Sequence, residues 1–488
     1  MSLVKNSAYN LFSSLVPAAL AFVTVPVYIH AIGEDRYGVV AIFAMLLGYF
    51  GVLDLGLSRA VAQRIAAAGG DRKDERATIF WSAALVNLGL GAAGAIAVFP
   101  IAEWVFNQQI KVPAQLRPEM LAAAPWLAMA IPIALITQVL RGAMQGAERF
   151  ASLNAITTFS AVSSQLISLA VVIWITPRLQ VVLPVMFATR LINLGGMGWQ
   201  VFRYILPHPR PSFDGRKALD LLSFGGWVAL SGLVSPLMTA FDRFLIGSMV
   251  SASAVSHYTV PYQLGERALI LPGAVSDALF PRIAAQTTEE ARKLAVQCMS
   301  ILSALMTPAM VCAILILQSF LSLWISPEFA LDAVVPGRIL LAGFCVNSFA
   351  FAFFIFLQAG GRPRLVALAH VIEVIPFFGV LYLGLKIWGV PGAAVAFSIR
   401  VAADCYLLAY FSGALRQAIM ASLMPIALLG CALFAAPLVR LDSPIGLALG
   451  GSLVLLSAAF GHQRLASHDI TVMNLWNSLR MRVRDRFM

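Results

Sequence analysis

The sequence predicts an all-α integral membrane protein of about fourteen transmembrane helices, built as two six-helix lobes related by pseudo-two-fold symmetry plus a C-terminal helix pair. The 488 residues are 60% hydrophobic and only 12% charged, which is more apolar surface than a soluble fold of this length can bury. Apolar runs of about 20 residues recur from end to end, and each can cross about 30 Å of hydrocarbon. Backbone groups in lipid must pair within their own segment, so these runs are expected to be helices.

The expected spans follow one another with short connections. They cover residues 7–31, 36–62, 77–99, 119–140, 151–175, 181–202, 219–248, 254–285, 294–322, 336–359, 365–385, 389–411, 419–438 and 444–461. The second and eighth are longer than a bilayer requires, so each is expected to tilt or to project into the cytoplasm. The first run exceeds the core of a signal peptide and leads into further spans, so it is interpreted as a retained first helix.

Lysine and arginine residues predict the orientation. With the N-terminus in the cytoplasm, 22 of the 34 basic residues lie on the cytoplasmic side and 7 on the other side, while five arginines lie inside spans. Cytoplasmic loops of membrane proteins are enriched in Lys and Arg, so both termini are expected in the cytoplasm of a bacterial inner membrane. The basic tail after residue 461 is expected to lie on the membrane surface, and the net charge of +11 is attributed to loops and anionic headgroups.

An internal repeat predicts the domain organisation. Arg64-Ile65-Ala66-Ala67 closes the second span and Arg282-Ile283-Ala284-Ala285 closes the eighth, and a charged loop follows each string. Both halves therefore begin in the cytoplasm and hold six helices, an arrangement that suits two bundles rocking about a central cavity. The predicted parts are an N-terminal lobe (1–215), a C-terminal lobe (216–415), an extra transmembrane hairpin (416–461) and a basic cytoplasmic tail (462–488).

Several kinds of chemistry lack their motifs in this chain. The five cysteines lie within apolar runs and form no CxxC, and the six histidines do not occur at metal-ligand spacing. No GxxxxGK[ST] occurs, so no P-loop nucleotide site is expected. We therefore predict neither a metal nor an organic cofactor, and any energy coupling would have to come from an ion gradient.

Short motifs spread along the chain resemble those of Wzx-type polysaccharide-unit flippases. The resemblance rests on Gly33-Glu34-Asp35-Arg36-Tyr37-Gly38, Leu53-Asp54-Leu55-Gly56-Leu57, Arg141-Gly142 with Gln145-Gly146 and Phe150, Asp242-Arg243-Phe244-Leu245-Ile246-Gly247, Leu357-Gln358-Ala359-Gly360-Gly361-Arg362 and Gly389-Val390-Pro391-Gly392-Ala393-Ala394. It extends over roughly residues 1–415. The order and spacing of the motifs are similar to this branch of the multidrug/oligosaccharidyl-lipid/polysaccharide exporter superfamily.

The resemblance implies a flippase that moves an undecaprenyl-pyrophosphate-linked oligosaccharide from the cytoplasmic to the periplasmic leaflet. It implies partners as well, namely membrane lipid, a polysaccharide polymerase and chain-length machinery for O-antigen or exopolysaccharide assembly. Wzx-type proteins usually have twelve helices. The extra pair here is similar to that of lipid II flippases, in which two added helices line a groove for the lipid tail.

Ionisable residues inside the spans are the candidate functional residues, since a charge in hydrocarbon costs several kcal/mol. Arginine suits a diphosphate substrate, because its planar guanidinium pairs with phosphate oxygens and stays charged. The candidates for substrate binding are Arg190, Arg59, Arg267, Arg243 and Arg400. Arg190 is the first choice, since it lies mid-span with no carboxylate three or four residues away. Arg59 and Arg267 occupy the matching second and eighth spans.

Every member of this set also admits a structural interpretation. Arg190, Arg59 and Arg267 could each pair with a carboxylate of another helix, and Arg59 could instead extend its side chain to the membrane interface. Asp404 lies four residues after Arg400, so the two are expected to neutralise each other on one helix face. Asp242 precedes Arg243 near the outer end of its span, where the pair suits either a gate or a packing contact.

Carboxylates within the spans are candidates for binding the coupling ion, either H⁺ or Na⁺. Glu373 lies midway along the eleventh span near Pro376, with His370 one turn earlier. Asp54 and Asp277 are the alternatives. A buried carboxylate held only by hydrogen bonds is the competing interpretation for each of them.

Two other functions stay open at this stage. A cation-coupled drug exporter of the same superfamily is compatible with the buried charges. The spans are expected to contain five arginines and six carboxylates, so the charge count does not favour an anionic substrate over a cationic one. A membrane polymerase or ligase acting on lipid-linked sugars is less favoured. The longest outer loop, about 100–118, contains Lys111 and Arg117 but no histidine for catalysis.

Overall fold

The computed structural model describes residues 3–54, 56–68, 72–206, 213–216, 238, 241–439 and 443–466, and within these ranges every regular element is a helix. Among the described residues, eleven helices are long and apolar enough to cross a membrane, which confirms the all-helical membrane fold. Helical segments account for the second and eighth predicted spans too, but neither forms one unbroken helix. Most of the seventh span, 219–248, lies outside the described residues, so the count of fourteen stays a prediction.

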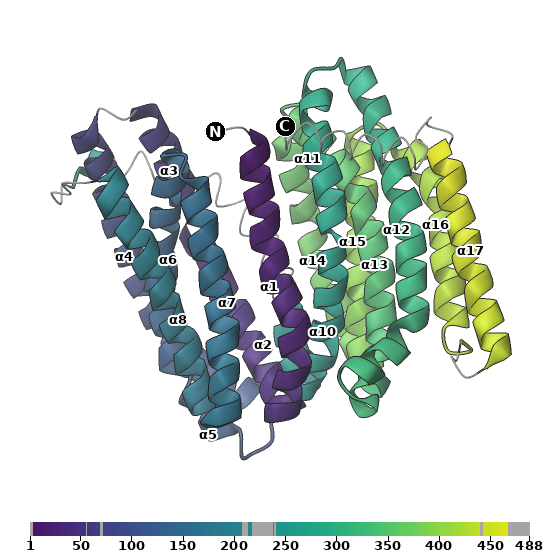
Figure 1. Ribbon diagram of the computed structural model, residues 1–488, viewed down its shortest axis with the longest axis horizontal. Coiled ribbons are helices and arrows are strands. Elements are labelled where there is room, and N and C mark those ends of the chain that lie inside the picture. The colour runs from purple at the N-terminus through teal and green to yellow at the C-terminus, as the bar shows by residue number, and fades with distance from the viewer. Residues whose placement is uncertain are drawn as a thin grey trace, which may run out of the picture. The chain divides into compact units, whose positions relative to one another are not determined.

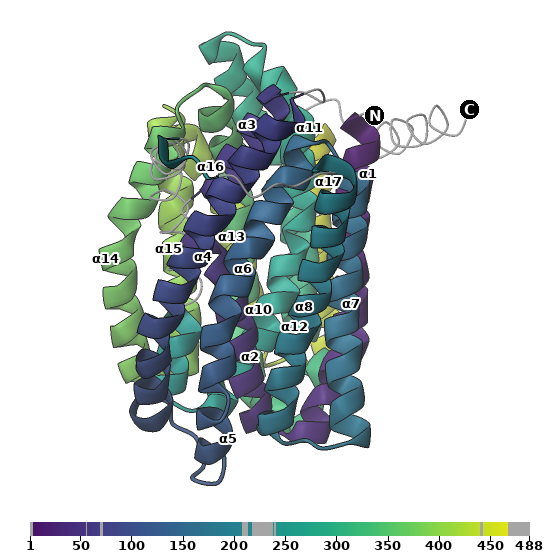
Figure 2. The same cartoon turned by 90° about the vertical axis from the view of Figure 1, so that its left-hand side faces the viewer.

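The chain forms two compact units, one up to Ser256 and the other from His257 onward. The first holds α1 (Leu3–Ile32), α2 (Glu34–Tyr49), η1 (Phe50–Asp54), α3 (Leu57–Ala68), α4 (Lys73–Trp104), η2 (Val105–Gln109), α5 (Arg117–Leu121), α6 (Ala124–Gly146), α7 (Phe150–Trp174), α8 (Leu179–Gln200) and η3 (Val201–Ile205). Residues 241–249 are helical as well. Figure 2 shows α4, α6, α8 and α7 as neighbours within this unit.

The second unit begins within α10 (Ala252–Ala268) and continues through the rest of the chain. It contains α11 (Ile270–Ala284), α12 (Thr288–Trp324), α13 (Pro327–Ala359), α14 (Pro363–Trp388), α15 (Val390–Phe411), α16 (Leu415–Ala435) and α17 (Pro444–Ala466). In Figure 1 the last two helices form an antiparallel pair, and both pack against α12. The extra hairpin predicted from the sequence therefore lies on the second unit.

The second and eighth predicted spans are interrupted at corresponding places in the repeat. The second span is divided by η1 and by Gly56, whose φ of 75° is accessible to glycine but strained for other residues. The eighth span is divided at Leu269, between α10 and α11. Leu269 lies 13 residues before Arg282, as Gly51 within η1 lies 13 before Arg64. The expectation of two continuous long helices is thus wrong, although the break itself follows the repeat.

Glycines let neighbouring helices approach to backbone contact in both units. A Cβ at Gly142 or Gly146 of α6 would overlap the backbone oxygen of Ser58 or Ala62 on α3. Between α14 and α15, a Cβ at Gly392 would overlap the backbone oxygen of Gly384. Small residues at such crossings are typical of membrane helix pairs, because dispersion and packing replace the hydrophobic effect there.

Candidate functional site

The turn between α1 and α2 shows the role of the Gly33–Gly38 motif. Asp35 Oδ1 accepts the backbone N–H of Ser253 at 3.1 Å, and a Cβ on Gly38 would overlap the carbonyl oxygen of Ala252. Arg36 donates to Glu119 at 2.9 Å, and Glu119 accepts the N–H of Leu179 at the start of α8. This motif is therefore a structural junction of the first unit, and Glu119 is a member that sequence reasoning missed.

Arg190 lies on α8, half-buried on the face that carries buried Leu183, Phe187 and Met197. Among the described residues it has no hydrogen bond or ion pair. A second arginine in this unit was missed as a candidate. Arg141 was expected just beyond the end of the fourth span, but α6 continues to Gly146 and therefore includes it. The Arg141 side chain is half-buried, and its Nε has no hydrogen-bond partner among the described residues. Guanidinium groups without partners are free to bind an anion.

Asp54 is held by hydrogen bonds at the end of η1. Its Oδ2 accepts the backbone N–H of Ser58 at 2.8 Å, next to the start of α3, and its Oδ1 accepts Asn87 Nδ2 at 2.6 Å. Asn87 is fully buried and also donates to the carbonyl of Leu135 on α6. Arg59 is exposed on α3, close enough for its charge to act on Asp54. We call Asp54, Ser58 and Asn87 the Asp54 centre.

The structure describes the three remaining predicted residues, Arg243, Arg267 and Asp277, to different extents. Arg243 is buried, and its Nη1 lies 3.9 Å from Asp242 Oδ1, which also accepts the Arg243 backbone N–H. Arg267 is half-buried two residues before the break at Leu269. The backbone of Asp277 belongs to α11, but its side chain lies outside the described part of the chain.

Glu373 lies in a cluster of charged side chains formed by α14 and α15. Its side chain is buried, with 4% exposure, and apart from the neighbouring Asp404 carboxyl neither carboxylate oxygen has a hydrogen-bond partner among the described residues. His370, one turn earlier on α14, brings Nε2 to 3.5 Å from Asp404 Oδ1 on α15. The charges of Asp404 and Arg400 both act on Glu373. We call His370, Glu373, Arg400 and Asp404 the Glu373 centre.

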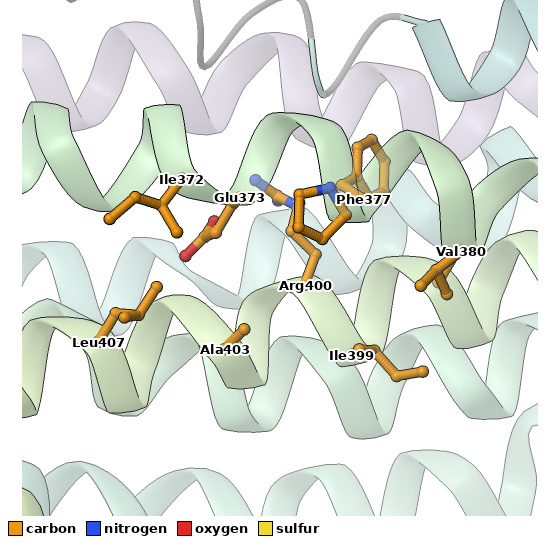
Figure 3. Close-up of a pocket in the computed structure, with 10 residues that line it drawn as sticks. Ile372, Glu373, Phe377, Val380, Ile399, Arg400, Ala403 and Leu407 are labelled. Carbon is orange, nitrogen blue, oxygen red and sulfur yellow. The ribbon is translucent and has the colours of Figure 1, made fainter.

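Arg400 and Asp404 do not form a contact ion pair: no nitrogen–oxygen distance between them is within 4.0 Å in the described structure, and Asp404 lies beside His370. The charge of Arg400 nevertheless acts on Asp404. The Arg400 guanidinium carbon lies 5.6 Å from the ring centres of both Phe377 and Phe397. Figure 3 shows Arg400 from α15 and Glu373 from α14 extending into the space between their helices. The helical spacing permitted the pair, but aromatic faces on two helices hold the guanidinium elsewhere.

A cavity of about 130 Å³ adjoins this centre (Figure 3). Glu373 and Arg400 are its charged lining residues, and the remaining lining side chains are hydrocarbon, among them Ile372, Phe377 and Leu407. The cavity is large enough for water, which needs about 10–15 Å³ on this measure. Two opposite charges with unsatisfied atoms thus face a small space between membrane-spanning helices.

Arg338 is a further buried charge that the sequence placed wrongly. Arg338 was one of the seven basic residues counted on the non-cytoplasmic side, because the tenth span was expected to begin at Pro336. The helix begins at Pro327 instead, with Ser326 Oγ accepting the N–H of Phe329. Arg338 is therefore inside α13, and donates to the carbonyls of Ile314 and Ala436. Its role is structural, since it joins α12 to the end of α16.

The first unit has an apolar groove lined from α4, α6, α8 and the π-helical turn after α8. Its volume is about 320 Å³, and Trp81 and Phe202 stack along it with ring centres 6.0 Å apart. Leu85 and Leu88 on its wall are half-exposed. The groove is therefore suited to hydrocarbon groups.

The fold and its buried charges define a multi-pass membrane protein built like a transporter. In solved structures, the lipid II flippase MurJ in an inward closed conformation shares the fold, with a TM-score of 0.71, 12% identity and coverage of 95% of this chain and all of that one. A multidrug resistance MATE family transporter of the MOP superfamily, in an inward-facing conformation, has a TM-score of 0.66 and 13% identity, over 84% of this chain and 98% of its own.

Sequence comparison gives the family. The family described as polysaccharide biosynthesis protein matches residues 3–287, and the chain belongs to it. A Shigella flexneri protein named "Putative O-antigen transporter" is 27% identical over 410 residues, covering 84% of this chain and 97% of the relative. A Haloferax volcanii protein named "Probable low-salt glycan biosynthesis flippase Agl15" is 23% identical over 431 residues, or 84% of each chain. The resemblance noted from the motifs is confirmed.

Proposed function

We propose that this protein is a flippase for undecaprenyl-pyrophosphate-linked oligosaccharide units in the bacterial inner membrane, with both termini in the cytoplasm. It would move each unit to the periplasmic leaflet by ion-coupled alternating access and supply a polysaccharide polymerase and its chain-length machinery. The names of its relatives support a glycan cargo, and its fold is that of a lipid II flippase and of drug exporters alike.

The observation that carries the proposal is Arg190. A half-buried guanidinium in a membrane-spanning helix is costly, and this one has no partner among the described residues. A diphosphate would provide the missing charge and up to two parallel hydrogen bonds. Arg59, Arg267, Arg243 and Arg400 are the other candidates for contact with the substrate, and Arg141 joins them from its geometry.

Ion coupling is assigned to the Glu373 centre in this proposal. Glu373 has only the Asp404 carboxyl as a described hydrogen-bond partner, whereas both Asp54 oxygens accept hydrogen bonds from N–H groups. Binding an ion at Glu373 would shift the balance between two conformations of the transporter, provided that the ion binds one of them more tightly.

Substitution of Arg190 tests the proposal. In a flippase-null strain, Arg190→Ala should abolish restoration of surface polysaccharide while the protein still reaches the membrane, and Arg190→Lys should restore it partly. Arg416→Ala removes an exposed arginine from α16 and is the matched control, expected to behave as the unsubstituted protein. Full restoration by Arg190→Ala or Arg190→Gln would remove this residue from the mechanism.

The drug-exporter alternative predicts a different result. Cells that express the protein would then accumulate less of a cationic dye, and Arg190→Ala would not weaken that export. Unchanged dye accumulation together with restored polysaccharide supports the flippase.

A further inference from the structure

The Glu373 centre has an unbalanced charge. Its described titratable groups are His370 and Glu373 on α14 with Arg400 and Asp404 on α15. With both carboxylates ionised and the imidazole neutral, the four side chains sum to one negative charge. A net charge inside a membrane-spanning bundle is costly, and removing it by protonation is the ordinary remedy for a buried carboxylate. One added proton makes the centre neutral.

Neighbouring helices add no described charge to this sum. On α13, which packs against α15, Arg338 is directed to the carbonyls of Ile314 and Ala436, and Asp332 lies 4.0 Å from His257. On α16, Arg416 is exposed. The remaining titratable group beside Asp404 is the buried Cys405 thiol, which is neutral in its usual form.

The wall of the cavity is suited to a proton and poorly suited to sodium. A hard cation takes several oxygen ligands, whereas the lining side chains other than Glu373 and Arg400 are hydrocarbon. Arg400 also places a fixed positive charge in the same space, which opposes a second cation but not the neutralisation of a carboxylate. His370 Nε2 lies 3.5 Å from Asp404, and an imidazole at this distance can carry a proton to or from the carboxylate.

We infer that the cavity between α14 and α15 takes one proton per transport cycle, shared by Glu373 and Asp404, balanced by Arg400 and exchanged through His370. In the binding step, a water-borne proton passes to His370 Nε2 and then to a carboxylate oxygen. Release reverses the step and returns the proton to water. The inference rests on the proposed transport function and names its coupling ion.

The test measures the proton directly and needs no substrate. Infrared difference spectra of the purified full-length protein in lipid vesicles, recorded against pH, report the C=O stretch of a protonated carboxyl group. We expect this band at neutral pH, unaltered when sodium replaces potassium at constant ionic strength. Glu373→Gln should remove it, and Glu328→Gln, an exposed matched control on α13, should leave it unchanged.

The charge count makes two further variants decisive. Asp404→Asn lowers the negative charge by one, so the band should vanish at neutral pH although Glu373 is still present. Arg400→Gln leaves two uncompensated negative charges, and the band should persist to at least about tenfold lower proton concentration. His370→Gln should keep the band but slow its appearance after a pH jump. Normal elution on size exclusion establishes that each variant is folded.

Three results would overturn the inference. They are a band that sodium removes, a band that survives Glu373→Gln, and a band that survives Asp404→Asn at neutral pH. A protein that fails to move lipid-linked oligosaccharide but shows the expected spectra would refute the proposed function and leave the proton site intact.

Discussion

The Asp54 centre and the Glu373 centre each bury a carboxylate, with 3% and 4% exposure, but they surround it with different hydrogen-bond partners. Asp54 accepts a hydrogen bond on each oxygen, from Ser58 and Asn87. Neither Glu373 oxygen accepts a hydrogen bond from a described N–H group; its described partner is a second carboxyl group, that of Asp404, and a cavity lies beside it. Burial alone therefore does not identify a functional carboxylate. The number of donors the fold provides separates an acid that holds helices together from one that is kept available.

The largest effect expected is on transport. Glu373→Gln keeps shape and polarity but cannot lose or gain a proton, so restoration of surface polysaccharide in the flippase-null strain should disappear. The free energy of unfolding should change by less than about 1 kcal/mol, because no described hydrogen bond is lost. Asp54→Asn is the matched substitution, and it should retain transport in whatever fraction still folds. Equal loss of transport in the two variants would end the distinction between the centres.

Next in size is the effect of Asp54→Ala on stability. The substitution leaves the Asn87 amide, which is fully buried, with one partner fewer and removes the acceptor for the Ser58 N–H. Each unsatisfied buried donor costs about 1–3 kcal/mol, so we expect a loss of about 3 kcal/mol. Denaturant titration in mixed micelles measures it. A loss below about 1 kcal/mol would show that water replaces the carboxylate and that Asp54 is not structural.

Glycine contacts between helices in the two units should respond alike. Gly146→Ala on α6 and Gly392→Ala on α15 each push a methyl group against a backbone oxygen, so each should destabilise by about 1–3 kcal/mol. Gly379→Ala on α14 is the control, since its Cβ meets nothing within 4 Å. It should stabilise by about 0.5–1 kcal/mol through helix propensity. Thermal unfolding in detergent compares the three, and a Gly392→Ala protein as stable as Gly379→Ala would contradict the packing.

The smallest effect expected concerns the aromatic contact of Arg400. Phe377→Leu removes one of the two rings near the guanidinium and should cost about 0.5–1 kcal/mol of interaction with it. A double-mutant cycle with Arg400→Gln isolates that term. If the two substitutions are additive within about 0.3 kcal/mol, the ring does not position Arg400.

Sequence patterns were sufficient for features that depend on local order. Apolar runs of membrane length predicted the helices, because lipid leaves the backbone no other way to pair its polar groups. The repeat of Arg-Ile-Ala-Ala predicted two matching halves, and the second helix of each is broken at the matching position. Glu373 with His370 one turn earlier was found from spacing alone.

Spacing could not supply the partners that come from other helices. Asn87 meets Asp54 from α4, His370 takes the place beside Asp404 that Arg400 was expected to occupy, and Glu119 joins Arg36 to α8. The helix boundaries beside Arg141 and Arg338 were missed too, since apolar runs mark where lipid begins and not where hydrogen bonding ends.

The sequence by itself determined that this chain is a helical membrane protein with an internal repeat and a small set of buried charges. The reason is that the length of each apolar run, and the free-energy cost of a charge within it, follow from the order of the residues alone. Only the tertiary structure decided which charges are satisfied, since hydrogen bonds between helices depend on how the helices pack. That difference turns Asp54 into a structural residue and leaves Glu373 open to its cavity.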